Sequence, residues 1–304
     1  MKLVRIVGIG FGVLIVIALC VYAWAEYAAG RKLSRDYAVH RQDFVIPSPS
    51  ADTATSSALE RGRHLVDSRY ACRGCHGSDL GGGVMIDAPA MGRILGPNLT
   101  TGNGSVTAGF SPADWDRIVR HGIKRDGKPA LMPSQDFRGM SDRELADIVV
   151  FLRAQPAVDR RMPAPTLGPV GKMLVATGKF ILSADLIQHD SPHPSTPPET
   201  GPTVEFGRHL AATCVGCHGD NLGGGPIVAG DPSWPPAANL TLAGLGDWTF
   251  DQFVTAMREG KRPDGTHLRN PMAELLPYAQ RMTETELQAL WSYLRSVPPV
   301  EDRE

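Results

Sequence analysis

Two short strings decide the fold of this 304-residue chain, Cys72-Arg73-Gly74-Cys75-His76 and Cys214-Val215-Gly216-Cys217-His218. Each has the form C-x-x-C-H, in which two cysteines attach a haem through thioether bonds and the histidine ligates its iron. The chain has five cysteines, and the one outside these strings is Cys20. An even number of extracytoplasmic cysteines would otherwise suggest disulfides, but the histidine after each pair favours haem. The sequence therefore predicts two covalently bound haem c groups, attached at Cys72, Cys75, Cys214 and Cys217.

The strings belong to two copies of one unit, whose period is close to the separation of Cys72 and Cys214. Glu60-Arg61-Gly62-Arg63-His64-Leu65 returns as Glu205-Phe206-Gly207-Arg208-His209-Leu210, and Asn98-Leu99-Thr100 returns as Asn239-Leu240-Thr241. A repeat of this kind means that each copy is one structural unit. Both halves are therefore expected to carry the same domain with one haem each.

Helical patterns dominate both units. A helix is expected before each motif, and its interior glycine, Gly62 or Gly207, predicts close approach of another backbone, because such a glycine otherwise costs about 1 kcal/mol. The last helix of each unit is predicted to begin at a capping box, Ser141-Asp142-Arg143-Glu144 or Thr283-Glu284-Thr285-Glu286. No long alternating strand pattern occurs in the sequence. The expected fold class is all-α, with two tandem helical domains, long glycine- and proline-rich loops, and an N-terminal apolar helix.

Residues 6–25 form an uncharged apolar run near the N-terminus. As a helix this run would span roughly 30 Å, the thickness of the hydrocarbon core of a bilayer. A cleaved signal peptide usually has a shorter apolar region of about 7–15 residues and a small-x-small cleavage site. Ala23-Trp24-Ala25 fits such a site, so cleavage is the alternative, but the length favours an uncleaved transmembrane anchor. Leu19 before Cys20 disfavours a lipoprotein.

Basic residues flank the apolar run on both sides, and they leave its orientation open. Because bacteria attach haem c outside the cytoplasmic membrane, the motifs predict a single-pass inner-membrane protein with periplasmic haem domains. We expect the apolar interior of the linker, residues 170–187, to pack on the domains rather than on a membrane surface. The predicted boundaries are 1–28 for the anchor, 29–55 for a stalk, 56–157 for the first domain, 158–202 for the linker and 203–304 for the second domain.

Each iron needs a second axial ligand besides the motif histidine, His76 or His218. In c-type cytochromes this ligand is usually a methionine, whose soft thioether favours ferrous iron. Met132 follows His76 at nearly the same distance as Met272 follows His218, and each methionine lies ahead of the last helix of its unit. We predict these two methionines as the ligands.

Two other repeated pairs have competing interpretations. Met140 and Met282 are alternative ligands, but each directly precedes a capping box, where an apolar residue usually packs onto the helix. Asn98 and Asn239 are interpreted as turn residues, and a hydrogen bond near the ligand loop is the alternative.

Four histidines outside the motifs also have competing interpretations. His64 and His209 repeat, but they precede the motif and would lie on the wrong side of the haem. We expect them at the surface or at the haem edge, and a contact with a propionate is the alternative. His121 and His267 have no histidine counterpart in the other unit. We expect both at the surface or at the haem edge.

With these motifs, the chain resembles two fused class I cytochrome c domains of the bacterial mono- and diheme family, over about residues 56–157 and 203–300. The resemblance implies a haem crevice enclosed by packed first and last helices, with axial pairs His76–Met132 and His218–Met272. The chain is also similar to haem subunits of membrane-bound periplasmic alcohol and sugar-acid dehydrogenases, which commonly carry three haems. It departs from the family at Ala273, where proline usually follows the ligand methionine.

Electron transfer is the expected function, from a periplasmic dehydrogenase or a quinol-oxidising complex to an oxidase or a soluble cytochrome. A haem subunit held permanently in a larger respiratory complex would differ only in its partner. The alternative is a diheme redox enzyme, a peroxidase or a thiosulfate-oxidising type, but each unit supplies a methionine and no further extracytoplasmic cysteine is present. We therefore expect no catalytic residues. The balance of 31 basic and 32 acidic residues argues against a nucleic-acid partner.

Overall fold

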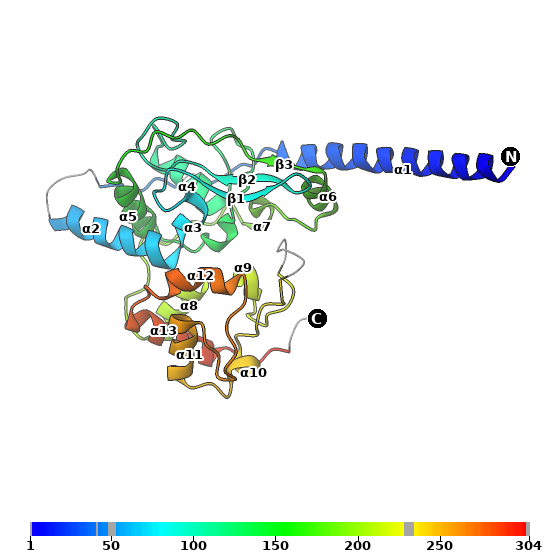
Figure 1. Ribbon diagram of the computed structural model, residues 1–304. Helices are drawn as coiled ribbons and strands as arrows, with labels where there is room; N and C mark the ends of the chain where they lie inside the picture. Colours follow the sequence, from blue (N-terminus) through cyan, green and yellow to red (C-terminus); the bar gives the residue numbers. More distant parts are fainter. Residues whose placement is uncertain (1, 41, 48–52, 228–233, 302–304) are drawn as a thin grey trace.

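The computed structural model of the protein describes residues 2–40, 42–47, 53–227 and 234–301, so positions 41 and 48–52 of the expected stalk lie outside the described residues. Two helical units lie side by side, and one long helix projects from the first of them (Figure 1). The first unit contains α2 (Thr53–His64), η1 (Leu65–Arg69), α3 (Cys72–His76), α4 (Pro112–His121), η2 (Ser134–Asp136) and α5 (Asp142–Arg153). The second contains α8 (Val204–Ala211), α9 (Val215–His218), α10 (Leu242–Leu245), α11 (Phe250–Glu259), α12 (Met272–Ala279) and α13 (Glu284–Ser296).

Each unit is built on a crossing between its first and last helices. α2 packs on α5, and α8 packs on α13. A Cβ atom at Gly62 would collide with the backbone of Asp147 in α5, and one at Gly207 would collide with the backbone of Ala289 in α13. The predicted close approach at both glycines is thus confirmed, because only a residue without a side chain lets the two backbones come so near.

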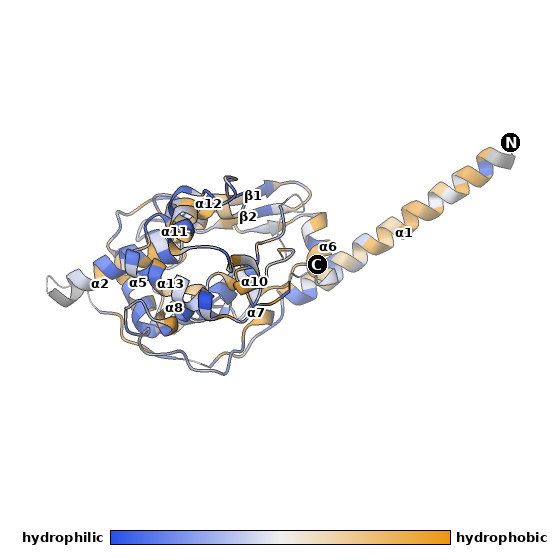
Figure 2. Ribbon diagram, turned by 90° about the horizontal axis from the view of Figure 1, so that it is seen from below, coloured by the Kyte–Doolittle hydropathy of each residue, from blue (hydrophilic) through white to orange (hydrophobic). Residues whose placement is uncertain are grey.

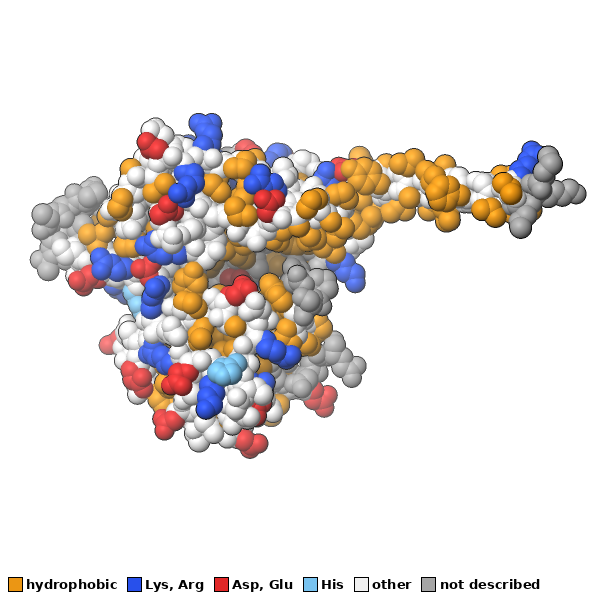
Figure 3. Space-filling view, in the orientation of Figure 1, with side chains coloured by type: hydrophobic (Ala, Val, Ile, Leu, Met, Phe, Trp, Pro, Cys, Tyr) orange, Lys and Arg blue, Asp and Glu red, His pale blue; other side chains and the backbone are white. Residues whose placement is uncertain are grey.

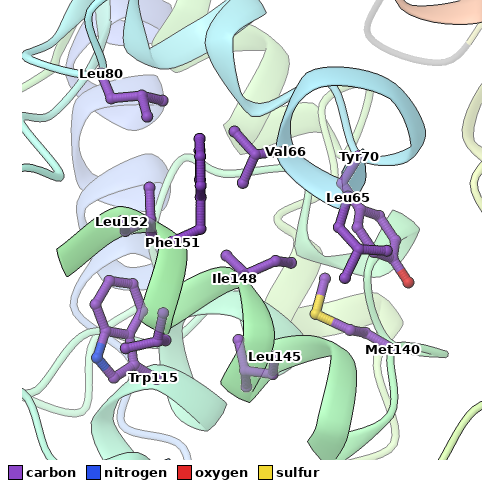
Figure 4. Close-up of a cluster of buried hydrophobic side chains, with 11 residues drawn as sticks. Leu65, Val66, Tyr70, Leu80, Trp115, Met140, Leu145, Ile148, Phe151 and Leu152 are labelled. Atoms are coloured by element: carbon purple, nitrogen blue, oxygen red, sulfur yellow. The ribbon is translucent and has the colours of Figure 1, made fainter. Parts of the chain in front are cut away.

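The predicted capping boxes are present at the start of both last helices. The Ser141 hydroxyl accepts from the Glu144 backbone N–H while the Glu144 carboxylate accepts from Ser141, and Thr283 and Glu286 do the same in the second unit. Behind α5 lies an apolar core, in which side chains of η1, α4 and α5 converge (Figure 4). Its buried members are Leu65, Val66, Tyr70, Leu80, Trp115, Met140, Leu145, Ile148, Val149, Phe151 and Leu152.

A small antiparallel sheet corrects the expected all-α class. β1 (Gly83–Ala88) pairs with β2 (Gly92–Gly96), and β2 pairs with β3 (Thr166–Leu167) from the linker. Helices account for 47% of the protein, so the chain is mainly but not wholly helical. The sequence did not indicate these strands because they are short and glycine-rich, and because one strand comes from a distant segment.

The apolar run lies in α1 (Lys2–Leu33), which projects from the body and is hydrophobic along most of its length (Figure 2). Val4–Leu33 is long and apolar enough to cross a membrane. At the inner end of α1, Ala25 and Ala29 are buried against α6 (Pro169–Thr177), which comes from the linker. The Lys172 ammonium lies 2.7 Å from the Glu26 carboxylate at the same junction. In the space-filling view, apolar side chains continue from α1 onto the adjoining body (Figure 3).

The linker and the expected stalk both lie along the first unit. α7 (Ser183–Leu186) follows α6 and contacts η2, so the apolar part of the linker packs on the anchor helix and the first unit. From the segment before α2, Phe44 and Ile46 pack against the core of the first unit. The backbone N–H of His40 donates to the carbonyl of His189 in the linker.

Candidate functional site

Both C-x-x-C-H strings form a short helix, α3 in the first unit and α9 in the second. The Nδ1 of His76 lies 2.9 Å from the carbonyl oxygen of Pro97, and the Nδ1 of His218 lies 2.7 Å from that of Ala238. A carbonyl can only accept, so each Nδ1 carries the proton and donates it to this bond. The lone pair of each Nε2 is therefore left for a ligand. A backbone acceptor behind a histidine is the usual way in which a metal ligand is oriented.

Asn98 and Asn239 hold the carbonyl groups that orient these histidines. The Asn98 side-chain oxygen accepts from the backbone and hydroxyl of Thr100, and its amide donates to the carbonyls of Val158 and Arg160. Asn239 repeats the pattern with Thr241 and Val300. Both asparagines are buried turn residues, as interpreted from the sequence. Each asparagine directly follows the residue whose carbonyl accepts from the ligand histidine. Its side-chain hydrogen bonds therefore also hold that carbonyl in place, a role that the sequence alone did not indicate.

The surroundings of the two motifs fit a haem c group. All five cysteines are unpaired, so the four motif thiols are available for covalent attachment. Burial raises the pKa of Cys72 to about 12, which keeps this thiol neutral. The hydroxyl of Tyr70 and the indole N–H of Trp115 are buried without a hydrogen-bond partner among the described residues, and a cofactor with carboxylates can satisfy such donors.

In the second unit a cavity of about 590 Å³ lies beside the segment that leads to Met272. Its described lining residues are Trp234, Pro235, Pro236, Arg269 and Asn270. This volume is within the range of about 300–1,000 Å³ that is usual for cofactor sites. Trp234 lies on the wall of the cavity.

The two predicted ligand methionines occupy different local structures. Met132 lies in the loop before η2, and its carbonyl accepts from the Ser183 hydroxyl at 2.5 Å. Met272 is the first residue of α12. Both are half-buried. The competing Met140 is buried in the apolar core beside Leu65 and Tyr70 (Figure 4), and Met282 packs against the core of the second unit, as expected for residues that anchor a helix.

Each motif lies against the other unit at the boundary between the units. A Cβ atom at Gly74 would lie 3.2 Å from the Tyr278 hydroxyl of the second unit, and one at Gly216 would collide with the Asp136 carboxylate of the first unit. Asp136 follows His76 at the same distance along the chain as Tyr278 follows His218, so the contacts are reciprocal. Sequence reasoning missed both residues, although their equal offset from the motif was a usable signal.

A second reciprocal pair of contacts joins the units through their capping boxes. The Nε2 of His64 lies 2.8 Å from the Glu286 carboxylate, and the Nε2 of His209 lies 3.0 Å from that of Glu144. Glu144 also pairs with the buried guanidinium of Arg69 at 2.5 Å. His64 and His209 thus bind the other unit through its last helix.

Of the two histidines without a histidine counterpart in the other unit, one is exposed and the other is buried. His267 is exposed at the surface, as expected. His121 is buried, with 1% of its side chain accessible, and lies among other histidines. The expectation of a surface position for His121 was therefore wrong, because His189 and His193 of the linker cover it.

Comparison with known proteins agrees with this geometry. Residues 204–298 match the family model described as cytochrome c, and residues 57–152 match the one described as cytochrome C oxidase, cbb3-type, subunit III. The chain is 28% identical to the cytochrome c subunit of alcohol dehydrogenase (quinone) from Gluconacetobacter polyoxogenes, over 84% of this chain and 58% of that protein. It is 25% identical to the fructose dehydrogenase cytochrome subunit of Gluconobacter japonicus, over 82% of this chain and 54% of the relative.

A third relative is closer in length. The diheme cytochrome c-type protein of Cereibacter sphaeroides is 24% identical over 76% of this chain and 83% of its own length. The chain therefore spans somewhat more than half of the two dehydrogenase subunits but most of a protein whose name specifies two haems.

Proposed function

Because this chain belongs to the diheme cytochrome c family and carries two covalently bound haem c groups, we propose that it is an electron carrier in which the haems form one transfer pair. Cys72 and Cys75 attach the first haem, and Cys214 and Cys217 attach the second. His76 with Met132 would hold the first iron, and His218 with Met272 would hold the second. The domains extend over 56–157 and 203–304, joined by the linker at 158–202.

The reciprocal contact of each motif with the other unit carries this proposal. Gly74 lies against Tyr278 and Gly216 lies against Asp136, so each attachment helix touches the segment that follows the ligand methionine of the other unit. Electron transfer through protein slows steeply as the separation of the redox centres grows. An arrangement that brings both attachment helices to one boundary favours rapid exchange between the haems.

The bound haem supplies a one-electron couple, and the protein residues tune and shield it. The Pro97 and Ala238 carbonyls hold the two imidazoles in the tautomer that ligates iron. With one histidine and one methionine holding each iron, no coordination position would remain for a substrate. This is the physical reason for a carrier rather than an enzyme that converts a substrate itself.

The anchor and the relatives suggest where the carrier works. α1 continues without a break from the apolar run to Glu26 and Ala29 at the junction with α6, so the apolar helix is joined to the folded body, which favours a retained single-pass anchor in the cytoplasmic membrane. The haem units then lie on the periplasmic side. Two of the three named relatives are cytochrome subunits of dehydrogenases, so the donor is a membrane dehydrogenase or a quinol-oxidising complex, and the acceptor is an oxidase or a soluble cytochrome.

Visible and near-infrared spectra of the purified holoprotein test the ligand assignment. In the oxidised protein, Met132→Ala and Met272→Ala should each remove half of the weak sulfur-to-iron band. Met140→Leu, which replaces a buried core methionine with a side chain of similar volume, should leave the whole band. A high-spin haem in the unmodified protein, or a band that neither ligand variant reduces, would overturn the assignment and favour the peroxidase-type alternative.

A further inference from the structure

A cluster of buried polar side chains lies at the end of α4. Asp116 and His121 come from α4, and His193 comes from the linker that covers this helix. Their side chains are 2%, 1% and 8% exposed, so the cluster is shut off from solvent. The haem motifs and the predicted axial ligands include none of these residues.

The donor atoms of the three side chains converge on one point. The Nε2 atoms of His121 and His193 lie 3.1 Å apart. Asp116 Oδ2 lies 3.8 Å from the Nε2 of His121, and Asp116 Oδ1 lies 3.7 Å from the Nε2 of His193. A tetrahedral ion with bonds of about 2.0–2.1 Å separates its ligand atoms by about 3.3 Å. The three separations in the protein, 3.1, 3.7 and 3.8 Å, are close to this value, with Asp116 offering one oxygen towards each imidazole.

The hydrogen bonds behind the two imidazoles leave both Nε2 atoms without a proton. The Nδ1 of His193 lies 3.0 Å from the carbonyl of Arg138, which can only accept, so the proton of His193 is on Nδ1. His189 donates from Nε2 to the carbonyl of Ala184 at 2.9 Å, so its Nδ1 accepts from the Nδ1–H of His121 at 3.0 Å. Two lone pairs therefore face each other at 3.1 Å, an arrangement that a cation bound by both nitrogens would stabilise.

The charges around the cluster also favour a cation. The guanidinium of Arg120 lies 2.6 Å from Asp116 Oδ1 and 2.8 Å from Asp142 Oδ1. Two carboxylates, those of Asp116 and Asp142, thus share one buried positive charge, that of Arg120. Both guanidinium contacts that the structure gives Asp116 go to Oδ1, and its Oδ2 lies 3.8 Å from the His121 imidazole, where it can bind an added ion.

We propose that Asp116, His121 and His193 bind a divalent transition-metal ion of the zinc class. Two imidazole nitrogens and one carboxylate are the donor set that this class of ion prefers, and three protein ligands leave its fourth position for water. The hydrogen-bond acceptors behind the imidazoles, the Arg138 carbonyl and His189, supply the outer contacts that orient such ligands.

An ion bound there would connect the linker, through His193, to α4 of the first unit, through Asp116 and His121. Ser134, two residues after Met132, donates its hydroxyl to the carbonyl of Ile118 in α4 at 3.0 Å. Ser183 of the linker donates to the carbonyl of Met132 itself. The ion would thereby hold in place both elements that support the Met132 loop.

Metal analysis of the holoprotein tests the proposal. The purified protein is treated with a chelator, supplied with Zn²⁺, dialysed, and analysed for zinc and iron by mass spectrometry. The result expected is one zinc for every two irons. His193→Ala and Asp116→Asn should reduce the zinc to background, whereas His267→Ala, at an exposed histidine of the second unit, should retain it.

An unchanged haem absorption spectrum in the variants shows that they have folded. Zinc uptake that persists in His193→Ala would place the ion elsewhere and overturn the proposal. Failure of the unmodified protein to retain zinc would also overturn it, and would mean that the two Nε2 atoms share a proton instead.

Discussion

The substitution Glu144→Gln tests the joint between the two haem units. Glutamine keeps the capping box, because its side-chain oxygen can still accept from the backbone of Ser141. It removes the negative charge that faces Arg69 at 2.5 Å and His209 at 3.0 Å. The side chains of Arg69 and Glu144 are both only 5% exposed, so the variant leaves a buried guanidinium without its counter-charge.

Two estimates of the cost agree. Burial by itself raises the pKa of Glu144, but the hydrogen bond from His209 and the charge of Arg69 outweigh it and hold the pKa at about 2, against an ordinary value of 4.5. At about 1.4 kcal/mol per pKa unit, this lowering corresponds to roughly 3 kcal/mol of stability. Removal of one partner from a buried ion pair generally costs about 3–5 kcal/mol. We expect a loss of roughly 3 kcal/mol at pH 7.

Glu286→Gln is the matched control in the second unit. The side chain of its partner His64 is 32% exposed. Arg69 lies three residues before Cys72, and Ala211 lies three residues before Cys214. The second unit therefore has no arginine at this position that the substitution would leave buried without a counter-charge. A partly exposed pair of this kind contributes about 1 kcal/mol or less. The pseudo-symmetry of the units thus provides the same substitution in two different electrostatic environments.

Guanidinium unfolding of the holoproteins is followed by haem absorption and circular dichroism. It gives the free energy of unfolding of the unmodified protein and the two variants at pH 7 and in steps down to pH 3. The stabilisation from Glu144 is fully present above about pH 4.5 and is lost as the pH falls through its folded pKa of about 2. The gap between the unmodified protein and Glu144→Gln should therefore narrow towards acid pH. Equal effects of the two substitutions at pH 7, or a gap that stays constant with pH, would refute the reasoning.

Three further substitutions test the structure around the motifs. Gly62→Ala forces a methyl group into the backbone of α5 and should cost about 1–3 kcal/mol in chemical unfolding; Gly30→Ala, which adds a methyl group in open space, is its control. Asn98→Ala removes the turn that holds the acceptor of His76, so it should lower the free energy of unfolding by about 1–3 kcal/mol and alter the spectrum of one haem only. Trp115→Phe removes a buried N–H that has no partner among the described residues; if this group neutralises a haem carboxylate, a redox titration should show a lower potential for one of the two haems.

The sequence alone predicted the features that depend on neighbouring residues. The C-x-x-C-H strings indicated the cofactor and its number, because the attachment chemistry is contained in five consecutive positions. The four residues of each capping box likewise contain the whole interaction, and the box at Ser141 is present in the structure. The glycines at positions 62 and 207 indicated helix crossings, although their partners in α5 and α13 were not identifiable.

The tertiary structure decided whatever joins distant parts of the chain. Glu144 and His209 were interpreted separately, as a cap and as a surface or haem-edge residue, and only the packing of the units makes them one ion pair. β3 completes its sheet from a linker that lies beyond α4 and α5 in the sequence, and His121 is buried by the same linker. Such contacts depend on which surfaces the two units and the linker present to each other. The spacing of residues along the chain does not indicate these contacts, because burial and charge in the folded protein determine them.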